Sequence, residues 1–148
     1  MLNIDAITLR LDKVEQNVSL LKELAALSFS DFQKNPVNFQ AAQHLLQVAI
    51  EASLNIGSHI ISAIGGRRPK DYKDIFIILG EEKVLTTDFA SKLVPMAKFR
   101  NVLVHLYFEV GIEELYRIMQ ENLDDFNEFS RQISEFIKEY EKENNVEK

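Results

Sequence analysis

The chain has 148 residues, 46% of them apolar, a formal net charge of −6 and no cysteine. This length fits one domain, residues 1–148, with a substantial core, and the lack of cysteine excludes disulfides, thiolate nucleophiles and thiolate metal sites. The acidic balance excludes a general nucleic-acid coat protein, and the lack of a signal-peptide pattern or a long apolar run favours a cytoplasmic protein with no membrane association.

Two long amphipathic helices are expected in the first half of the chain. Apolar residues recur at three- and four-residue spacing over residues 4–25, which is typical of a helix that packs in a bundle. Asn35 and Pro36 then provide an N-cap and a first-turn proline for a second helix, and glycines 65–66 end it. Small residues along this second helix, such as Gly57, allow a neighbouring helix to approach closely.

A polar stripe follows one face of the second helix. Its members are spaced by four residues and are Gln47, Glu51, Asn55 and His59. Because most such stripes face water, we interpret it as a solvent-exposed surface.

In the second half of the chain, capping residues and apolar spacing predict one short and two long helices. Asp71 can cap the apolar segment 72–80, which we expect to be a helix because no second strand is available to pair with it. Thr86 or Thr87 can cap a helix that continues into residues 99–107, and helical spacing resumes from Ile112 to Tyr140. We expect the last eight residues, 141–148, to fray. The fold class is therefore all-α, an antiparallel four-helix bundle with one additional short helix.

The segment FRNVLVHLY, residues 99–107, contains the residues most suited to chemistry. Arg100, Asn101, His105 and Tyr107 interrupt an apolar run there. An arginine binds phosphate with a fixed fork of donors, a histidine can transfer a proton near neutral pH, and a tyrosine carries a phenolic hydroxyl. This combination indicates chemistry on a phosphate ester.

On a continuous helix, all four motif residues would share one side, and Tyr107 would lie within about 20° of Arg100, two turns further along. Four apolar residues would form the opposite, core-facing stripe: Phe99, Val102, Leu103 and Leu106. Val104 and Phe108 would fall on the polar side, where a partner surface would explain two apolar residues. Taken singly, each motif residue could also be an ordinary surface cation, a bundle histidine or a rim aromatic.

The segment FRNVLVHLY, with supporting similarity in 91–99, 116–126 and 44–61, resembles HEPN domains, and more closely the HepT family of toxins that are encoded beside MNT nucleotidyltransferase antitoxins. The resemblance covers nearly the whole chain and implies a metal-independent ribonuclease whose active site forms across a homodimer. It assigns catalysis to Arg100 and His105, a supporting role to Asn101, and adenylylation by the antitoxin to Tyr107.

The mechanism that we expect uses two His105 residues, one from each chain, as acid and base at an RNA phosphate, while Arg100 stabilises the developing negative charge. The RNA 2′-hydroxyl would attack, giving a cyclic phosphate without a metal or cofactor. The histidines and aspartates elsewhere in the chain lack the spacing of a metal site. Two alternatives stay open: a non-catalytic helical module that binds a nucleotide or a nucleotidyltransferase, and a purely structural dimer.

A cluster of cations precedes the short helix and comprises Arg67, Arg68, Lys70 and Lys73. Such a run is commonly a solvated loop, but it could add a few RNA contacts near the active site.

Overall fold

The structure is a computed structural model that describes residues 1–146. In this part of the chain it consists of helices and no strands. The α-helices are α1 (Ile4–Ala25), α2 (Phe29–Lys34), α3 (Pro36–Ile64), α4 (Tyr72–Glu81), α5 (Thr87–His105), α6 (Ile112–Glu121) and α7 (Asp124–Val146), with a 3-10 turn η1 (Tyr107–Glu109). None of the described helices is long and apolar enough to cross a membrane.

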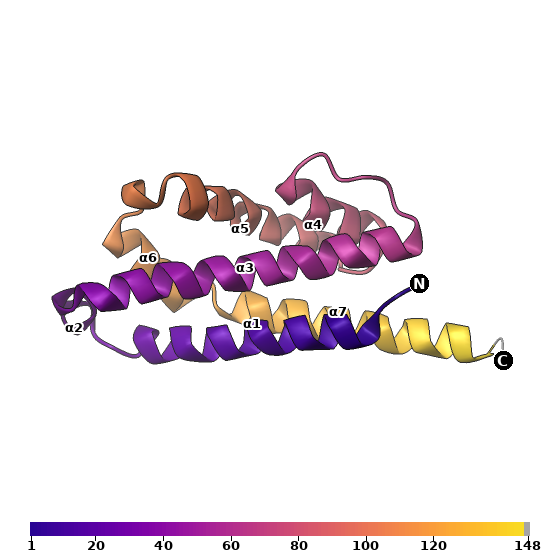
Figure 1. Ribbon diagram of the computed structural model, residues 1–148, viewed down its shortest axis with the longest axis horizontal. Helices are drawn as coiled ribbons and strands as arrows, with labels where there is room; N and C mark the ends of the chain where they lie inside the picture. Colours follow the sequence, from indigo (N-terminus) through magenta and orange to yellow (C-terminus); the bar gives the residue numbers. More distant parts are fainter. Residues whose placement is uncertain (147–148) are drawn as a thin grey trace.

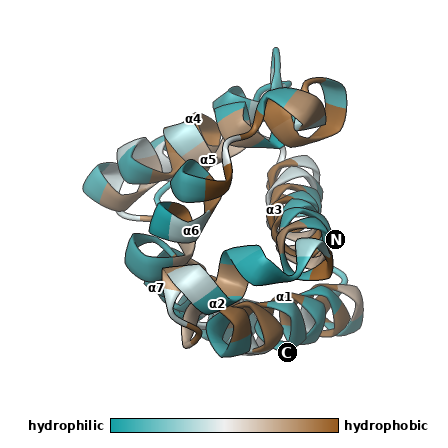
Figure 2. Cartoon of the chain, turned by 90° about the vertical axis from the view of Figure 1, so that its left-hand side faces the viewer, coloured by the Kyte–Doolittle hydropathy of each residue, from teal (hydrophilic) through white to brown (hydrophobic). Residues whose placement is uncertain are grey.

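The four long helices α1, α3, α5 and α7 run alternately in opposite directions (Figure 1), which confirms the expected all-α, antiparallel arrangement. An end-on view places them around a common centre (Figure 2). The buried apolar residues form one core cluster, and its largest fully buried side chains include Phe32, Phe76, Phe126 and Phe129. Burial of this apolar surface is the main stabilising term of the fold.

The helix ends in the first half lie where the sequence predicts them. The Asn35 side chain accepts a hydrogen bond from the Val37 amide, with Pro36 in the first turn of α3. Gly65 ends α3 with φ of 74°, a conformation that a residue with a Cβ adopts only at a cost. Gly57 allows α4 to approach, since a Cβ at this position would lie 2.7 Å from Ile75 Cγ2. The small face of α3 therefore receives α4.

Segment 72–80 is helical, as expected, and the Asp71 side chain caps α4 by accepting a hydrogen bond from the Asp74 amide at 3.0 Å. Two further short helices, α2 and α6, add to the one that the sequence predicted. The fraying expected for residues 141–148 is not seen as far as Val146, and residues 147–148 lie outside the described part.

The helix predicted from Ile112 to Tyr140 is divided into α6 and α7 at Asn122 and Leu123. Side chains of α6 explain the division, because they bond to carbonyls at the end of α1. The Tyr116 hydroxyl donates to the Leu27 carbonyl and Gln120 Nε2 donates to the Ala25 carbonyl, each at 2.7 Å. These bonds satisfy groups that an α-helix end leaves without partners, and they give α6 a direction of its own.

Candidate active site

The motif residues occupy the last turns of α5 and the 3-10 turn that follows. Thr86 caps the start of α5, and His105 is its last residue. The continuous helix expected through Tyr107 is therefore wrong, and Tyr107 lies in η1 rather than beside Arg100 on one helix face. Gln43 of α3 donates a hydrogen bond of 3.0 Å from Nε2 to the Tyr107 carbonyl, and Gly111 is the N-cap of α6. This tertiary hydrogen bond uses a carbonyl that a continued helix would pair with the amide of residue 111, and so favours the early end of α5.

Arg100 is held by residues from three different helices. Its guanidinium lies over the Tyr72 ring of α4, with Cζ 4.4 Å from the ring centroid. Its Nε is 3.4 Å from Oε1 of Glu51 in α3, and its Nη1 donates to Oδ1 of Asn101 at 3.2 Å. The side chain is only 16% exposed. A stacked, ion-paired arginine of this kind has a fixed orientation.

The Nη2 donors of Arg100 nevertheless stay available, whereas Nε is inaccessible to a ligand. Nε is buried and makes an ion pair with Glu51 without the geometry of a hydrogen bond. Nη2 donates no hydrogen bond to any side chain or carbonyl that the structure describes. An oriented guanidinium with unused donors is suited to hold a phosphate oxygen in a forked contact.

Glu51 was missed as a site residue, because we interpreted its stripe as solvent-exposed. That interpretation is wrong for most of the stripe: Gln47 donates to Glu51 Oε1 at 3.2 Å, and His59 Nε2 accepts from the Asn3 amide at 3.0 Å. Asn55 alone of the four is exposed. The four-residue spacing of the polar stripe could have indicated a second face of α3, directed at α5. Nothing in the linear sequence, however, pairs Glu51 with Arg100.

Tyr72 was also missed. It is 28 positions before Arg100 in the chain, and the packing of α4 against α5 brings the two side chains together. The exposed aromatic at the start of a short amphipathic helix was the only available signal.

The end of the motif is exposed, in contrast to Arg100. The His105 side chain makes no hydrogen bond or ion pair with the described residues. Tyr107 and Phe108 are 63% and 71% exposed and pack edge to face, with ring centroids 5.8 Å apart. Leu106, expected in the core stripe, is exposed because α5 ends before it, whereas Leu103 is buried as expected.

The chain brings Arg100 and Asn101 together and leaves His105 apart from both. On a helix, five positions separate Arg100 and His105 by about 140° around the axis and about 7.5 Å along it. Asn101 is exposed and contacts Arg100 rather than His105. One chain therefore holds the oriented guanidinium of Arg100 and the imidazole of His105 at separate places.

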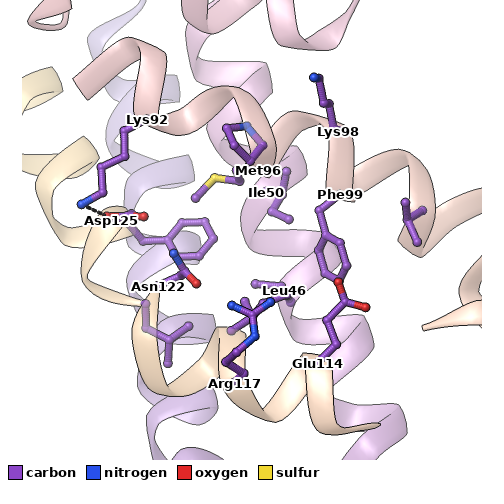
Figure 3. Close-up of a pocket in the computed structure, with 15 residues that line it drawn as sticks. Leu46, Ile50, Lys92, Met96, Lys98, Phe99, Glu114, Arg117, Asn122 and Asp125 are labelled. Carbon is purple, nitrogen blue, oxygen red and sulfur yellow. Dashed lines mark ion pairs between the residues drawn. The ribbon is translucent and has the colours of Figure 1, made fainter. Parts of the chain in front are cut away.

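A cavity of about 450 Å³ lies on the other side of α5, between α3, α6 and α7 (Figure 3). Its wall includes the apolar side chains of Leu46, Met96 and Phe99, and Lys92 pairs with Asp125 at 3.1 Å at its edge. None of the four motif residues lines it. Because none of the motif side chains reaches it, we do not assign the active site to this cavity.

Residues 1–146 contain no cluster of three or more histidine, aspartate or glutamate side chains placed to hold a metal ion. The strongest charge cluster is instead a structural one. Arg67 forms a forked pair with Asp74, at 2.7 and 2.8 Å, and also contacts Glu81 at 3.0 Å. The Arg67 guanidinium lowers the pKa of Asp74 to about 2, so this carboxylate is ionised at neutral pH.

Comparison with known proteins places the chain in one family. The family model described as "Ribonuclease HepT-like" matches residues 14–133. A tRNA nuclease HepT from Aphanizomenon flos-aquae is 26% identical over 146 residues, covering 97% of this chain and 99% of the relative. An mRNA nuclease HepT from Shewanella oneidensis is 30% identical over 84 residues, covering 57% of this chain and 63% of the relative.

A solved structure agrees with the fold. The tri-AMPylated Shewanella oneidensis HEPN toxin in complex with its MNT antitoxin superposes with a TM-score of 0.81 and 23% identity, covering 89% of this chain and 98% of the toxin. The same fold over nearly the whole of both chains agrees with the family match. The chain therefore belongs to the HepT-like ribonuclease family.

Proposed function

We propose that this protein is a toxin that cleaves RNA at a composite site formed by two copies of the chain. The observation that carries this proposal is the division of the motif. Arg100 is oriented by Glu51 and Tyr72, while His105 stands apart from it on the surface. A second copy that brings its own His105 and Arg100 to the same cleft would complete a site with two cations and two proton-transferring groups.

The proposed reaction is the attack of the RNA 2′-hydroxyl on the adjacent phosphorus. One His105 takes the proton of the 2′-hydroxyl, and a bond forms between the 2′-oxygen and phosphorus. The bond from phosphorus to the 5′-oxygen breaks, and His105 of the partner subunit gives a proton to that oxygen. Arg100 holds the phosphate oxygens and stabilises their increased negative charge. The products are a 2′,3′-cyclic phosphate and a 5′-hydroxyl, and no metal ion takes part.

The exposed residues beyond His105 support a homodimer. Leu106, Tyr107 and Phe108 are 41%, 63% and 71% exposed and are consecutive in the chain. Neighbouring exposed apolar side chains are typical of a surface that a partner covers. They directly follow His105, so a second copy that covers them would also bring the two His105 residues close together.

RNA is the proposed substrate class because both named relatives are nucleases of RNA, one of tRNA and one of mRNA. Cleavage through the 2′-hydroxyl also requires RNA rather than DNA. We propose the cytoplasm as the location, since RNA substrates and the nucleotide donor for adenylylation are found there.

The proposed regulator is an MNT-type nucleotidyltransferase that adenylylates Tyr107. The related HEPN toxin from Shewanella oneidensis was solved in an AMPylated state with an MNT antitoxin. Tyr107 is 63% exposed, two residues after His105, and its carbonyl is anchored by Gln43. A nucleotide attached to this hydroxyl would place bulk and negative charge in the proposed dimer cleft and exclude the RNA phosphate.

The test is expression of the wild-type chain beside Arg100→Ala and His105→Ala, with growth and total RNA measured for each. We expect growth arrest and RNA fragments ending in cyclic phosphate for the wild type alone. Co-expression with an MNT-type enzyme should restore growth and add AMP to a peptide containing Tyr107, and Tyr107→Phe should stay toxic. Equal growth and intact RNA in all strains would reject catalysis and favour a nucleotide- or partner-binding module.

A further inference from the structure

A groove opens beside Arg100 at the surface between α3, α4 and α5. It has a volume of about 600 Å³ and is lined by residues that include Ser58, Arg68, Lys70, Tyr72 and Asn101. Two of these flank the arginine, because Asn101 accepts its Nη1 hydrogen bond and Tyr72 lies against its guanidinium. The groove therefore adjoins the arginine that would hold the cleaved phosphate.

The basic loop that forms one wall of the groove is anchored to α4. Asp74 accepts the two hydrogen bonds of Arg67 and a third from the Lys70 amide at 3.0 Å, and Glu81 contacts Arg67 as well. Because Asp74 is a buried, ionised carboxylate with three donors, it fixes the backbone of residues 67–70. The loop has a defined shape before any ligand arrives.

The anchoring divides the four cations of the loop into two groups. Arg67 is neutralised by Asp74 and Glu81, and Lys73 pairs with Asp71 at 3.0 Å. Arg68 and Lys70 are exposed, line the groove and have no ion-pair partner within residues 1–146. Asp71, the acidic residue in the lining, is occupied by Lys73 and by the amide of Asp74.

We propose that this groove binds the phosphate backbone of single-stranded RNA adjacent to the cleaved bond, with Arg68 and Lys70 as the phosphate contacts. Two unpaired cations in a groove whose wall includes Tyr72 and Asn101, the two neighbours of Arg100, would set the direction in which the strand crosses the active site. The chain as a whole is acidic, with a formal net charge of −6, so a local cationic track would orient the strand by repulsion elsewhere. This inference rests on the proposed ribonuclease function.

The test measures RNA binding and cleavage separately. Binding of a fluorescent 12-nucleotide single-stranded RNA is measured in the His105→Ala background, and cleavage is measured in the wild-type background. The variant is Arg68→Ala with Lys70→Ala. The matched control is Lys98→Ala, an exposed cation of α5 that has no ion pair in the described chain and lines the cavity on the other side of that helix.

We expect the double variant to bind RNA roughly tenfold more weakly, and to reduce the slope of log affinity against log salt by about 1.4, the value for two phosphate contacts on a single strand. KM for cleavage should rise by a similar factor while kcat changes less than twofold. Arg68→Lys with Lys70→Arg should bind like the unsubstituted protein, since the charges are kept.

Binding and salt dependence equal to those of Lys98→Ala would overturn the groove assignment while wild-type cleavage continued to support the ribonuclease. Conversely, RNA binding that depends on Arg68 and Lys70 without any cleavage by the wild type would support the groove and overturn the catalytic proposal. Because Arg68 and Lys70 are exposed, we expect the double variant to have the same far-UV spectrum and melting temperature as Lys98→Ala.

Discussion

The two ends of the motif differ in how well the side chains of one chain cover them. Arg100 is 16% exposed and contacts Glu51, Tyr72 and Asn101. Five residues later, His105 is exposed and lies next to the exposed Leu106, Tyr107 and Phe108. A single chain therefore orients the guanidinium of Arg100 but leaves the His105 imidazole and its apolar neighbours exposed.

This difference in exposure arises because different neighbours pack against the two ends of the motif. Both α3 and α4 pack against α5, and Arg100 meets a side chain from each of them. At the end of α5 the neighbouring contact is the Gln43 hydrogen bond to the Tyr107 backbone, which fixes the chain path without covering the side chains. We expect each end to respond differently to substitution.

The largest expected effect separates activity from stability. His105→Asn should lower the cleavage rate by at least about a hundredfold because it removes the proton transfer. It should change the free energy of unfolding by less than about 0.5 kcal/mol, since the side chain is exposed without partners. Arg100→Ala should also abolish cleavage but cost about 1 kcal/mol, because Tyr72 loses its stacking partner and Glu51 its ion pair. Single-turnover experiments measure the cleavage rate, and urea unfolding measures the free energy of unfolding. Equal destabilisation by both variants would contradict the difference in packing between Arg100 and His105.

Phe108→Asp tests whether the exposed end is a dimer surface. Burying a phenylalanine in an interface contributes roughly 2 to 3 kcal/mol, so the substitution should weaken dimerisation by about 30- to 150-fold. Sedimentation at several protein concentrations measures this. Leu20→Asp is the control, since Leu20 is 47% exposed on α1. A wild-type chain that stays monomeric at high concentration would refute the proposed interface.

Glu51→Gln probes how far the ion pair orients Arg100. The amide keeps the size of the carboxylate but loses its charge, so we expect kcat to fall roughly three- to tenfold through poorer positioning of the guanidinium. RNA affinity in the His105→Ala background should change little. Glu113→Gln, on the exposed face of α6, is the control and should leave cleavage unaltered. An unchanged kcat for Glu51→Gln would mean that Tyr72 and Asn101 suffice.

The smallest effect concerns the anchor of the basic loop. The pKa of Asp74 is lowered from 3.8 to about 2, chiefly by its hydrogen bonds from Arg67. A lowered pKa stabilises the fold above about pH 4, and this contribution disappears as the pH falls through 2. Asp74→Asn should therefore be less stable than wild type at pH 7 by about 1 to 2 kcal/mol, a range that allows for the solvent-exposed Arg67.

The stability difference between wild type and Asp74→Asn should shrink toward pH 2, and denaturant unfolding across pH 2 to 7 would follow it. Asp12→Asn, at an exposed position on α1, should show no such convergence. A difference that stays constant with pH would mean that the Arg67 pair contributes nothing through the Asp74 charge.

Much of the fold could be read from the sequence because the signals are local. The apolar spacing over residues 4–25, the cap and proline at the start of α3, and Gly65 at its end each act within a few residues. The helical state of segment 72–80 followed from the absence of a pairing strand. Arg100, Asn101, His105 and Tyr107 could be selected because their residue types, in that order, are unusual in an apolar run.

What the tertiary structure decided depends on contacts between distant segments. α5 ends at His105 because Gln43 of α3 bonds to the Tyr107 carbonyl, and α6 separates from α7 because its side chains bond to the end of α1. Glu51 and Tyr72 lie at Arg100 only because α3 and α4 pack against α5. Local propensity determines which segments form helices, whereas the helix ends and the neighbours of a side chain are determined by hydrogen bonds and packing that form only in the folded chain.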